Sequence, residues 1–268
     1  MEKGRRIGEG RTAEVFEWGE GKVLKLYRDW CPPDWARHEA EVARVAHAAG
    51  APVPAVGYVL EVDGRPGIVC ERVDGRSLRD QLTAAPWRSG AIGAALARLH
   101  RALHERRAAP GRLPRLREKV TSAVVASREV LGDDAGRALE ALAALPDGDA
   151  LCHYDFHPDN VLGEGDGARI IDWSNGCVGP PAADVARTLL VLRSPYLPDD
   201  VPAALRPFAA GVKRWLAAGY ASEYRRLSGL KQAEIDAWLA PIAAARLRED
   251  VPGEREWLVG LVRGAREG

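Results

Sequence analysis

A run of eight residues in the middle of the chain concentrates polar side chains that can act on phosphate. Residues 153–160 read HYDFHPDN, and a short apolar segment shortly afterwards ends at Asp172. Asn160 and Asp172 offer oxygen donors of the kind that Mg²⁺ binds together with substrate phosphates. Asp155 adds a carboxylate that can receive the proton of an attacking hydroxyl group. These residue types therefore predict a phosphoryl-transfer site, with Asp155 as the base and Asn160 and Asp172 as metal ligands.

A zinc site is the alternative for the same stretch, because Cys152, His153, His157 and Cys177 lie close together in the sequence. Zinc sites usually combine tighter pairs of ligands, such as C-x-x-C with H-x-x-x-H. The chain contains no C-x-x-C pair. The spacing therefore favours magnesium and phosphate chemistry over zinc.

The first quarter of the chain must supply part of the scaffold for these residues. Alternation of apolar and polar side chains predicts short strands at residues 5–10, 14–18, 23–27, 57–62 and 67–72. Helical spacing predicts one helix over residues 34–49, and Gly50 stands where that helix would stop. The pair Asp63-Gly64 predicts a tight hairpin between the last two strands. We expect a small antiparallel sheet with one helix.

From residue 73 onward, the spacing of apolar residues is largely helical. It predicts helices at residues 78–82, 89–107, 116–131, 135–145, 183–192, 207–226, 233–248 and 255–262. An insert at residues 150–172 breaks this pattern and predicts two short strands, 160–162 and 169–171. The expected fold class is α+β with two lobes: a small β-rich N-terminal lobe, 1–72, and a larger, mainly α-helical C-terminal lobe, 73–268.

Composition argues against several classes of protein. Lys+Arg and Asp+Glu both number 38, so the formal net charge is zero, and broad binding to nucleic acid or an anionic membrane needs a basic face. No segment approaches the run of about 20 apolar residues that spans a membrane. The four cysteines are dispersed, as in proteins of a reducing compartment. We expect a cytoplasmic protein without nucleic-acid or membrane partners, either a monomer or a weak dimer.

The string HYDFHPDN, followed by a strand and an Asp, resembles the H-x-D-x-x-x-x-N signature of the protein-kinase-like superfamily. Together with Ile170-Ile171-Asp172-Trp173, it looks like the aminoglycoside phosphotransferase and choline kinase branch. Protein kinases instead carry Arg where Tyr154 stands and Phe-Gly after the metal-binding Asp, while many members of the branch have Gly in place of Tyr154. The resemblance covers nearly the whole chain. It implies a bilobal protein-kinase-like fold with a nucleotide and Mg²⁺ between the lobes.

The same resemblance assigns roles in the N-terminal lobe. Residues 8–15, GEGRTAEV, resemble a glycine-rich loop in which Gly8 and Gly10 let main-chain N–H groups approach phosphates. Lys25 resembles the lysine that contacts the α- and β-phosphates, and Glu39 resembles the glutamate that pairs with that lysine. A shift of the predicted helix by one or two residues would put Glu41 in that place, so both glutamates are candidates.

Residues 70–73, CERV, resemble the hinge between the lobes. The main chain of Glu71 and Val73 would bind the edge of the base, and Val15 and Ile171 would form its apolar walls. The residues do not distinguish ATP from GTP.

Two further residues resemble support positions. His100 matches a histidine at a helix end that packs and forms hydrogen bonds. Asp184 would cap its helix and brace the loop that carries Asp155.

The implied activity is ATP-dependent transfer of phosphate to a hydroxyl group of a small molecule. The stretch from Asp172 to Asp184 is too short for the activation segment with which protein kinases dock peptides. Glu249 and Asp250 are the candidate acceptor-binding residues because they follow a predicted helix end, and with nearby aromatic side chains they could hold a hydroxylated cation. An aminoglycoside-like antibiotic, which would imply antibiotic resistance, is the leading acceptor.

Other acceptors and other activities stay open on the sequence alone. Choline, homoserine and sugars are alternative acceptors. A nucleotide-binding pseudokinase and a small, atypical protein kinase are alternative functions. A pseudokinase would be recognised by a missing base or metal ligand, and Lys25, Asp155, Asn160 and Asp172 are all present.

Overall fold

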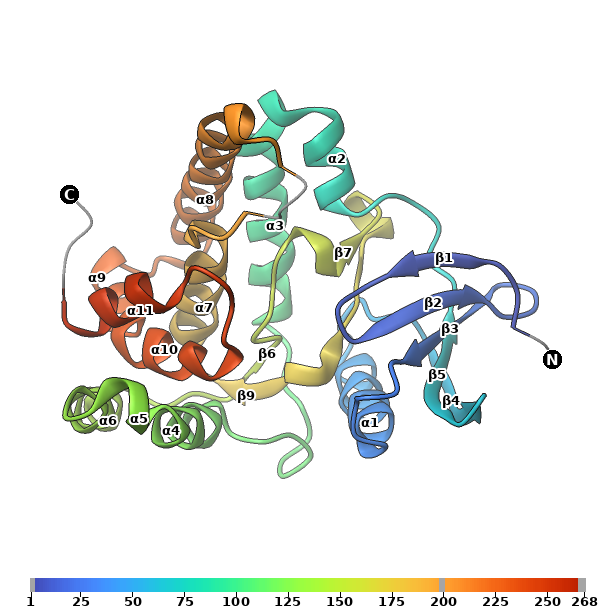
Figure 1. The fold of residues 1–268 in the computed structure, drawn as a ribbon, viewed down its shortest axis with the longest axis horizontal. Helices are drawn as coiled ribbons and strands as arrows, with labels where there is room; N and C mark the ends of the chain where they lie inside the picture. Colours follow the sequence, from blue (N-terminus) through green and yellow to red (C-terminus); the bar gives the residue numbers. More distant parts are fainter. Residues whose placement is uncertain (1–2, 198–200, 265–268) are drawn as a thin grey trace.

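The computed structural model describes residues 3–197 and 201–264, and its N-terminal part is a five-stranded antiparallel sheet (Figure 1). The strand order is β1-β2-β3-β5-β4. One helix, α1 (Asp34–Ala48), packs against the sheet. The strands are β1 (Arg6–Glu9), β2 (Ala13–Glu17), β3 (Lys22–Tyr27), β4 (Val56–Val62) and β5 (Arg65–Glu71). Asp63 and Gly64 both have positive φ, at 54° and 76°, as a two-residue hairpin turn requires, so that prediction is confirmed.

The two faces of this sheet have different partners because side chains alternate along each strand. Leu24 and Leu26 lie in an apolar cluster on one face. On the other face Tyr27 and Ile68 pack against residues of α1. Lys25 pairs with Ile68 across β3 and β5, so it shares the face that meets α1. The strand period therefore directs one lysine toward the helix and the interior.

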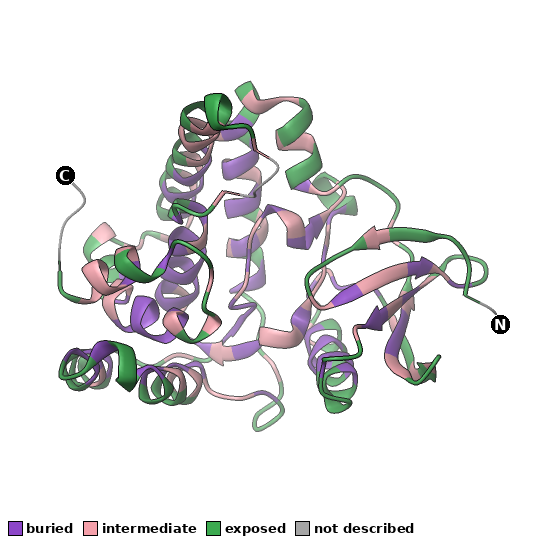
Figure 2. Ribbon diagram, in the orientation of Figure 1, coloured by how far each residue is buried: buried purple, intermediate pink, exposed green. Residues whose placement is uncertain are grey.

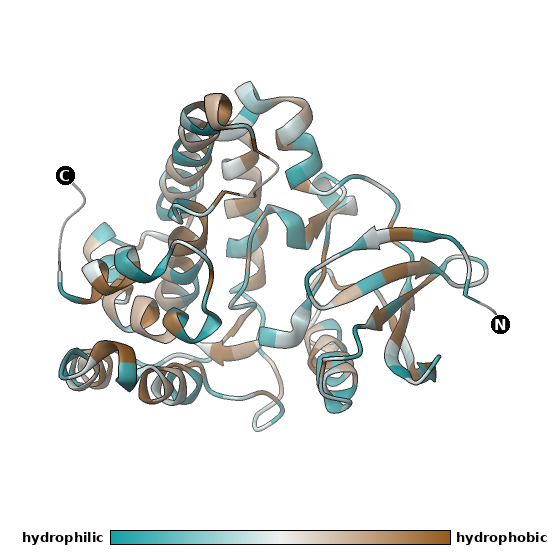
Figure 3. Cartoon of the chain, in the orientation of Figure 1, coloured by the Kyte–Doolittle hydropathy of each residue, from teal (hydrophilic) through white to brown (hydrophobic). Residues whose placement is uncertain are grey.

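The remainder of the chain is mainly helical, and its buried residues line the inward faces of the helices, as the purple segments of Figure 2 show. Figure 3 shows that the hydrophobic residues follow the same faces. None of the described helices combines the length and the apolar character needed to cross a membrane. The helices are α2 (Leu78–Ala84), α3 (Ser89–Leu103), α4 (Leu116–Ala126), α5 (Arg128–Leu131), α6 (Asp134–Ala144), α7 (Pro181–Arg193), α8 (Arg206–Ser228), α9 (Gln232–Asp236), α10 (Leu239–Arg246) and α11 (Arg255–Val262).

Two small antiparallel sheets lie between the five-stranded sheet and the helices (Figure 1). β7 (Val161–Leu162) pairs with β8 (Arg169–Ile170), close to the two strands expected in the insert. β6 (Ala150–Cys152) pairs with β9 (Cys177–Gly179), a pairing that the sequence pattern does not predict. A 3₁₀ turn, η2 (Pro158–Asn160), and another, η4 (Trp173–Asn175), flank the hairpin. The α+β fold class, with a sheet-and-one-helix part and a mainly helical part, is confirmed.

Three predicted helices are shorter or broken. The helix expected at residues 89–107 ends at Leu103. The helix expected at 116–131 breaks at Ser127, whose hydroxyl donates a hydrogen bond to the Ala123 carbonyl and so competes with the helical pattern. The helix expected at 233–248 divides into α9 and α10, with Pro241 in the first turn of α10, where a missing N–H costs no helical bond.

The closest helix packing is between α3 and α8, where glycines remove the side chains. A Cβ atom added to Gly93 would lie 2.2 Å from the Leu216 carbonyl oxygen and 2.8 Å from the Tyr220 nitrogen. A Cβ atom added to Gly219 would lie 2.3 Å from the Gly90 carbonyl oxygen. These backbone atoms belong to rigid helices, so the contact needs glycine.

We predict that Gly93→Ala lowers the free energy of unfolding by about 3 kcal/mol, because the two helices must separate to admit the methyl group. Thermal or urea denaturation of the purified protein measures the effect. Gly90→Ala is the control: its added Cβ meets no atom within 4 Å, and alanine favours the helix. Equal losses of stability in the two variants would contradict the close packing.

Candidate functional site

Lys25 connects the sheet to the central hairpin through two carboxylates. Its Nζ lies 2.7 and 2.8 Å from the two carboxylate oxygens of Glu39 on α1, and 3.2 Å from Oδ1 of Asp172. Burial alone would lower the pKa of Lys25, but the charges of Glu39 and Asp172 raise it well above its usual value. The ammonium group is therefore held in its charged form at the meeting point of the two parts of the chain.

The structure selects Glu39 over Glu41 as the partner of Lys25. Glu39 is buried at 6% exposure and also accepts a hydrogen bond from the Tyr27 hydroxyl. Glu41 lies on the outer side of α1, with 65% of its side chain exposed, and its carboxylate is 3.7 Å from Arg112.

Asp172 lies two residues after the end of β8 and adopts a left-handed backbone with φ of 62°. Its Oδ1 accepts bonds from Lys25 and from the Ser174 hydroxyl, at 3.2 Å each. Within the described residues, no hydrogen bond reaches its Oδ2. Burial raises the pKa of Asp172, but the charge and hydrogen bond of Lys25 lower it, and the net shift is downward. The Asp172 carboxylate is thus ionised, and within the described residues its Oδ2 has no hydrogen-bond partner.

Asn160 lies beside Asp172 because the Ile171 amide donates to the Asn160 carbonyl across the hairpin, at 3.0 Å. The Asn160 side-chain nitrogen donates to the main-chain oxygen of Asp155 at 2.9 Å. The amide is planar, so its oxygen faces away from that bond. The amide oxygen of Asn160 and the carboxylate of Asp172 are hard oxygen donors of the type that Mg²⁺ prefers, and the donor set fits this metal.

His153 joins Asp155 to the same hairpin. The Asp155 amide donates to Nδ1 of His153 at 3.3 Å, and Nε2 of His153 lies 3.0 Å from the Ile171 carbonyl oxygen. Burial lowers the pKa of His153, so the ring is neutral and can accept at one nitrogen and donate at the other. This one side chain therefore fixes the spacing between Asp155 and the start of the Ile171-Asp172 segment.

Two cations flank the Asp155 carboxylate. Nε2 of His157 lies 3.6 Å from one carboxylate oxygen, and a terminal nitrogen of Arg187 lies 3.5 Å from the other. Burial raises the pKa of Asp155, but the hydrogen bond and charge of His157 and the charge of Arg187 hold it well below its usual range. Burial opposes protonation of His157 too, yet Asp155 and Asp159 raise its pKa to about 10. Asp155 is therefore an ionised carboxylate beside an imidazolium.

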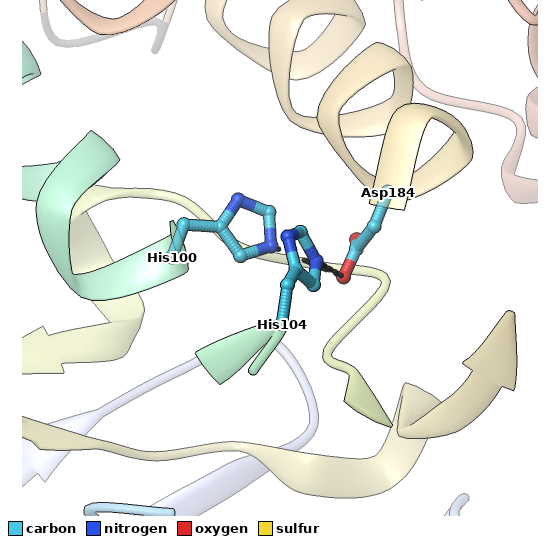
Figure 4. A group of neighbouring side chains, drawn as sticks. All are labelled: His100, His104 and Asp184. Carbon is cyan, nitrogen blue, oxygen red and sulfur yellow. Dashed lines mark hydrogen bonds and ion pairs between the residues drawn. The ribbon is translucent and has the colours of Figure 1, made fainter. Parts of the chain in front are cut away.

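Asp184, on the first turn of α7, is fully buried and accepts from four N–H groups, of which Figure 4 shows the two imidazoles, His100 and His104. Its carboxylate accepts from the main-chain amides of His153 and Tyr154 at 2.8 and 2.9 Å. Nε2 of His100 and Nε2 of His104 lie 3.1 and 3.2 Å from its Oδ2. Burial opposes ionisation, but the two imidazoles hold the pKa of Asp184 well below its usual range. Asp184 thus anchors the loop that leads into Asp155.

Tyrosines complete this network from α8. The hydroxyls of Tyr220 and Tyr224 lie 2.7 and 2.6 Å from Nδ1 of His100 and His104. Burial lowers the pKa of His100 to about 3, so that ring is neutral. Within the described residues, His100, His104 and Asp184 form the cluster whose ligand atoms lie within 4.8 Å of one another. Each of its ring nitrogens already has a hydrogen-bond partner, so a metal there would have to displace one.

The cysteines and histidines considered for zinc have other contacts. Cys152 and Cys177 face each other across β6 and β9 and are buried. His153 lies against the Ile171 carbonyl, and Nδ1 of His157 lies 3.2 Å from Asp159. The two cysteines therefore face each other, and each histidine has a different partner of its own.

The loop between β1 and β2 is exposed, and the side chain of Arg28, which follows β3, forms hydrogen bonds with it. Arg28 donates to the Glu9 carboxylate at 2.6 Å and to the carbonyl oxygens of Gly10 and Arg11 at 3.2 and 3.1 Å. Neither Gly8 nor Gly10 has a positive φ, and an added Cβ would meet its nearest protein atom at 3.5 and 3.7 Å, respectively. The fold therefore does not require glycine at these two positions, although the Gly10 amide already donates to the Ala13 carbonyl at 2.8 Å.

The hinge segment follows β5. The Glu71 carboxylate accepts from the Ala55 amide at 3.0 Å, so its side chain is committed to the fold. Within the described residues, the Val73 main chain makes no hydrogen bond outside secondary structure. Val15, opposite Lys25 on β2, and Ile171 are half-buried. The main chain of Val73 and these two apolar side chains are free to meet a ligand.

Glu249 and Asp250 have different surroundings. The Glu249 carboxylate is bound from both sides, 2.7 Å from Arg187 and 2.9 Å from Arg246. The Asp250 side chain is 79% exposed and lies 3.0 Å from Arg255. Glu249 and Asp155 thus contact the same side chain, that of Arg187, whereas Asp250 lies at the surface.

Sequence reasoning missed several residues that surround the site. Arg187 is 2% exposed and lies three residues after Asp184 on α7, and a fully buried arginine is unusual. His104 follows His100 by four residues, and Tyr224 follows Tyr220 by four, so each pair shares a helix face. Those spacings are visible in the sequence, but the meeting of the two pairs is not.

Comparison with protein families gives one match. The model of a family described as phosphotransferase enzymes matches residues 3–229. A comparison with curated protein sequences gave no match.

Solved structures with a similar fold include aminoglycoside phosphotransferases and a choline/ethanolamine kinase family protein. Aminoglycoside phosphotransferase APH(4)-Ia, as a thermostable mutant in ternary complex with ADP and hygromycin B, has a TM-score of 0.66 at 18% identity, with 97% of this chain and 92% of that chain covered. A type VIII aminoglycoside-3'-phosphotransferase has a TM-score of 0.58 at 22% identity, with 90% and 91% covered. A choline/ethanolamine kinase family protein from Mesorhizobium loti has a TM-score of 0.54 at 22% identity, with 98% and 88% covered. At these identities the likeness establishes the shared kinase-like fold.

Proposed function

Because this chain belongs to the phosphotransferase enzyme family and is a small-molecule kinase, we propose that it transfers the γ-phosphate of ATP or GTP to a hydroxyl group. The observation that carries the proposal is the contact of Lys25 with both Glu39 and Asp172. This contact joins Lys25, on the sheet, to Asp172, which follows the β7–β8 hairpin. Asn160 precedes the same hairpin, and its side chain donates to the main-chain oxygen of Asp155. A fold alone does not require a half-buried lysine between two carboxylates.

The nucleotide would lie between residues 1–72 and 73–268, which we propose as the two lobes. Lys25 and the main chain around Gly8 and Gly10 would bind its phosphates. The main chain of Glu71 and Val73 would bind the base edge, between Val15 and Ile171.

Asn160 and Asp172 would hold Mg²⁺. When bound, the metal neutralises phosphate charge. The ionised state of Asp172 and its free Oδ2 prepare that side chain for a metal ligand role.

Asp155 would accept the proton of the acceptor hydroxyl. The hydroxyl oxygen forms a bond to the γ-phosphorus, the bond from that phosphorus to the β–γ bridging oxygen breaks, and the nucleoside diphosphate leaves with the electron pair. Asp155 is ionised in the structure, so it can receive the proton, and Asp184 fixes the loop that aims it. Positioning and charge neutralisation supply most of the acceleration.

We propose a chemical class for the acceptor, not a single compound. The family resemblance supports an aminoglycoside-like antibiotic or another polar, cationic metabolite, with antibiotic resistance as the corresponding role. Choline, homoserine and sugars are the alternatives. We propose a cytoplasmic enzyme that works as a monomer or weak dimer, without nucleic-acid or membrane partners. Lys25 contacts Asp172, and Asn160 contacts the main chains of Asp155 and Ile171, so the proposed base and metal ligands lie in one network of contacts; this supports an enzyme over a pseudokinase.

A coupled assay of nucleoside diphosphate release tests the proposal. The purified protein is incubated with ATP or GTP, with Mg²⁺ or with EDTA, and with a panel of aminoglycosides, choline, homoserine and sugars. We expect release that depends on one acceptor and on Mg²⁺, together with a phosphorylated product in the mass spectrum. Release that is independent of every acceptor, or phosphorylation of added protein substrates alone, would refute small-molecule transfer by this site.

The contact between His157 and Asp155 predicts the pH dependence of the reaction. The pKa of Asp155 is held low, so the base stays ionised as pH falls and is protonated only below the usual range of a carboxyl group. His157→Ala removes the main cause of the lowering, and burial then raises the pKa of Asp155. We expect the acid limb of kcat/KM to move to higher pH in the variant. Superimposable pH profiles would show that His157 does not control the base.

A further inference from the structure

The carboxylates beside Asp155 are already neutralised by arginine. Glu249 is bound by Arg187 and Arg246, and Arg246 also lies 2.6 Å from the buried Glu254. Arg187 is 3% exposed at its side chain and contacts Asp155 as well as Glu249. A cationic acceptor would therefore meet acids whose charge is already matched. Binding it would require breaking the ion pairs that Glu249 makes with two buried arginines.

Lys119, on α4, has the opposite character: it is a half-buried cation without an acidic partner. Its Nζ donates to the Asn175 carbonyl at 2.8 Å, in the turn that follows Asp172. Within the described residues it takes part in no salt bridge. Burial lowers the pKa of Lys119, and the charges of Asp184 and Asp155 oppose that shift only in part. The chain has only six lysines, and this is a second one placed near the site.

Tyr154 connects Lys119 to the base. Nζ of Lys119 lies 5.6 Å from the centre of the Tyr154 ring, and the Arg187 guanidinium carbon lies 5.4 Å from it. Tyr154 immediately precedes Asp155 and has a positive φ of 62°, a conformation that costs a non-glycine residue free energy. The ring is 8% exposed, and within the described residues its hydroxyl makes no hydrogen bond. Two cations therefore lie against the ring of the residue that precedes Asp155, and one of them, Arg187, also contacts the Asp155 carboxylate.

We infer that the acceptor of the proposed reaction is a hydroxy compound that carries an anionic group, such as a carboxylate, and that Lys119 binds this group while Asp155 receives the hydroxyl proton. The inference rests on the proposed phosphotransfer and narrows its acceptor. An ammonium group with one carbonyl partner has donors left for a carboxylate, and charge-assisted bonds of this kind are strong. Among the described residues the ammonium group of Lys119 is unpaired, so a polycationic acceptor would meet it as a like charge, which disfavours that acceptor.

The test compares acceptors of different charge in the diphosphate-release assay with MgATP. The probes are D-glycerate as an anion, L-homoserine as a zwitterion, glycerol as a neutral compound, choline as a cation and kanamycin as a polycation. We expect the highest kcat/KM among the carboxylate-bearing probes. Kanamycin as the best acceptor would overturn the inference and leave the phosphotransfer itself intact. If no probe raises diphosphate release above background, and Asp155→Asn gives the same background, the result would instead refute the proposed function.

Variants of Lys119 separate recognition from a structural role. Lys119→Met should lower kcat/KM for the carboxylate-bearing probe roughly 10- to 100-fold, mainly through KM, and change glycerol turnover less than about 2-fold. Lys119→Arg keeps the charge and should restore most of the KM. Lys231→Met, at an exposed lysine on the border of α9, is the matched control and should leave both probes unchanged. An equal loss for glycerol and the carboxylate in Lys119→Met would assign Lys119 to the scaffold and contradict the inference.

Discussion

Asp155→Asn is expected to lower kcat by about 10³-fold or more while leaving nucleotide affinity within about 2-fold of the wild type. The amide has the size of the carboxylate but cannot take the hydroxyl proton. It also leaves His157 and Arg187 without the charge that they flank. Lys25, Asn160 and Asp172 do not depend on the Asp155 side chain, so the nucleotide site stays intact.

Turnover by the diphosphate-release assay and nucleotide binding by calorimetry measure the two quantities on the same samples. Asp166→Asn, at an exposed position between β7 and β8, is the control and should keep wild-type kcat. Near-normal turnover in Asp155→Asn would remove Asp155 from the chemistry. Loss of nucleotide binding along with turnover would instead assign Asp155 to the nucleotide site.

Asp184→Ala should be the most destabilising single change near the site, at about 4 kcal/mol. Removal of the carboxylate strands four N–H groups: the amides of His153 and Tyr154, and the ring nitrogens of His100 and His104. These groups are buried, so water does not replace the lost acceptor at low cost. The loop that precedes Asp155 then loses its anchor, and turnover should fall with stability.

Urea denaturation compares Asp184→Ala with Asp149→Ala, whose carboxylate is 77% exposed and pairs with Arg107. The control should lose less than about 1 kcal/mol, as surface ion pairs do. A second variant, Tyr224→Phe, removes one hydroxyl behind His104 and should give a smaller loss. An Asp184→Ala protein as stable as its control would contradict the four-bond network.

The sequence predicts the parts of the site that are local. Asp155 and Asn160 lie within one short string, and Asp172 follows a strand of the hairpin that the string begins. Their types and their order along the chain are therefore enough to indicate metal and proton chemistry. Lys25 is found through the family resemblance, since a strand lysine alone indicates nothing.

The features that the sequence leaves open depend on helix phase and on contacts between distant segments. Glu39 and Glu41 differ by two residues on one helix, and only the packed orientation of α1 decides which one meets Lys25. His100 and Tyr220 are 120 residues apart and meet because α3 and α8 pack closely at Gly93. No local pattern encodes such a meeting.

The acceptor side shows the same limit more sharply. Glu249 is expected to bind the acceptor because it follows a predicted helix end, and in the structure it does lie after the end of α10. Its charge is nevertheless matched by Arg187, 62 positions earlier in the chain, and by Arg246. Lys119 carries no signal of its own in the sequence, because its role depends on Tyr154 and Asn175, which reach it only through the tertiary fold.

A crystal structure with Mg²⁺ and a non-hydrolysable ATP analogue tests the central claim most directly. The account predicts Lys25 Nζ on the phosphates and the metal bound by the side-chain oxygens of Asn160 and Asp172, with Asp155 facing the γ-phosphate. An analogue bound away from Lys25, or a metal held elsewhere, such as between His100, His104 and Asp184, would contradict it.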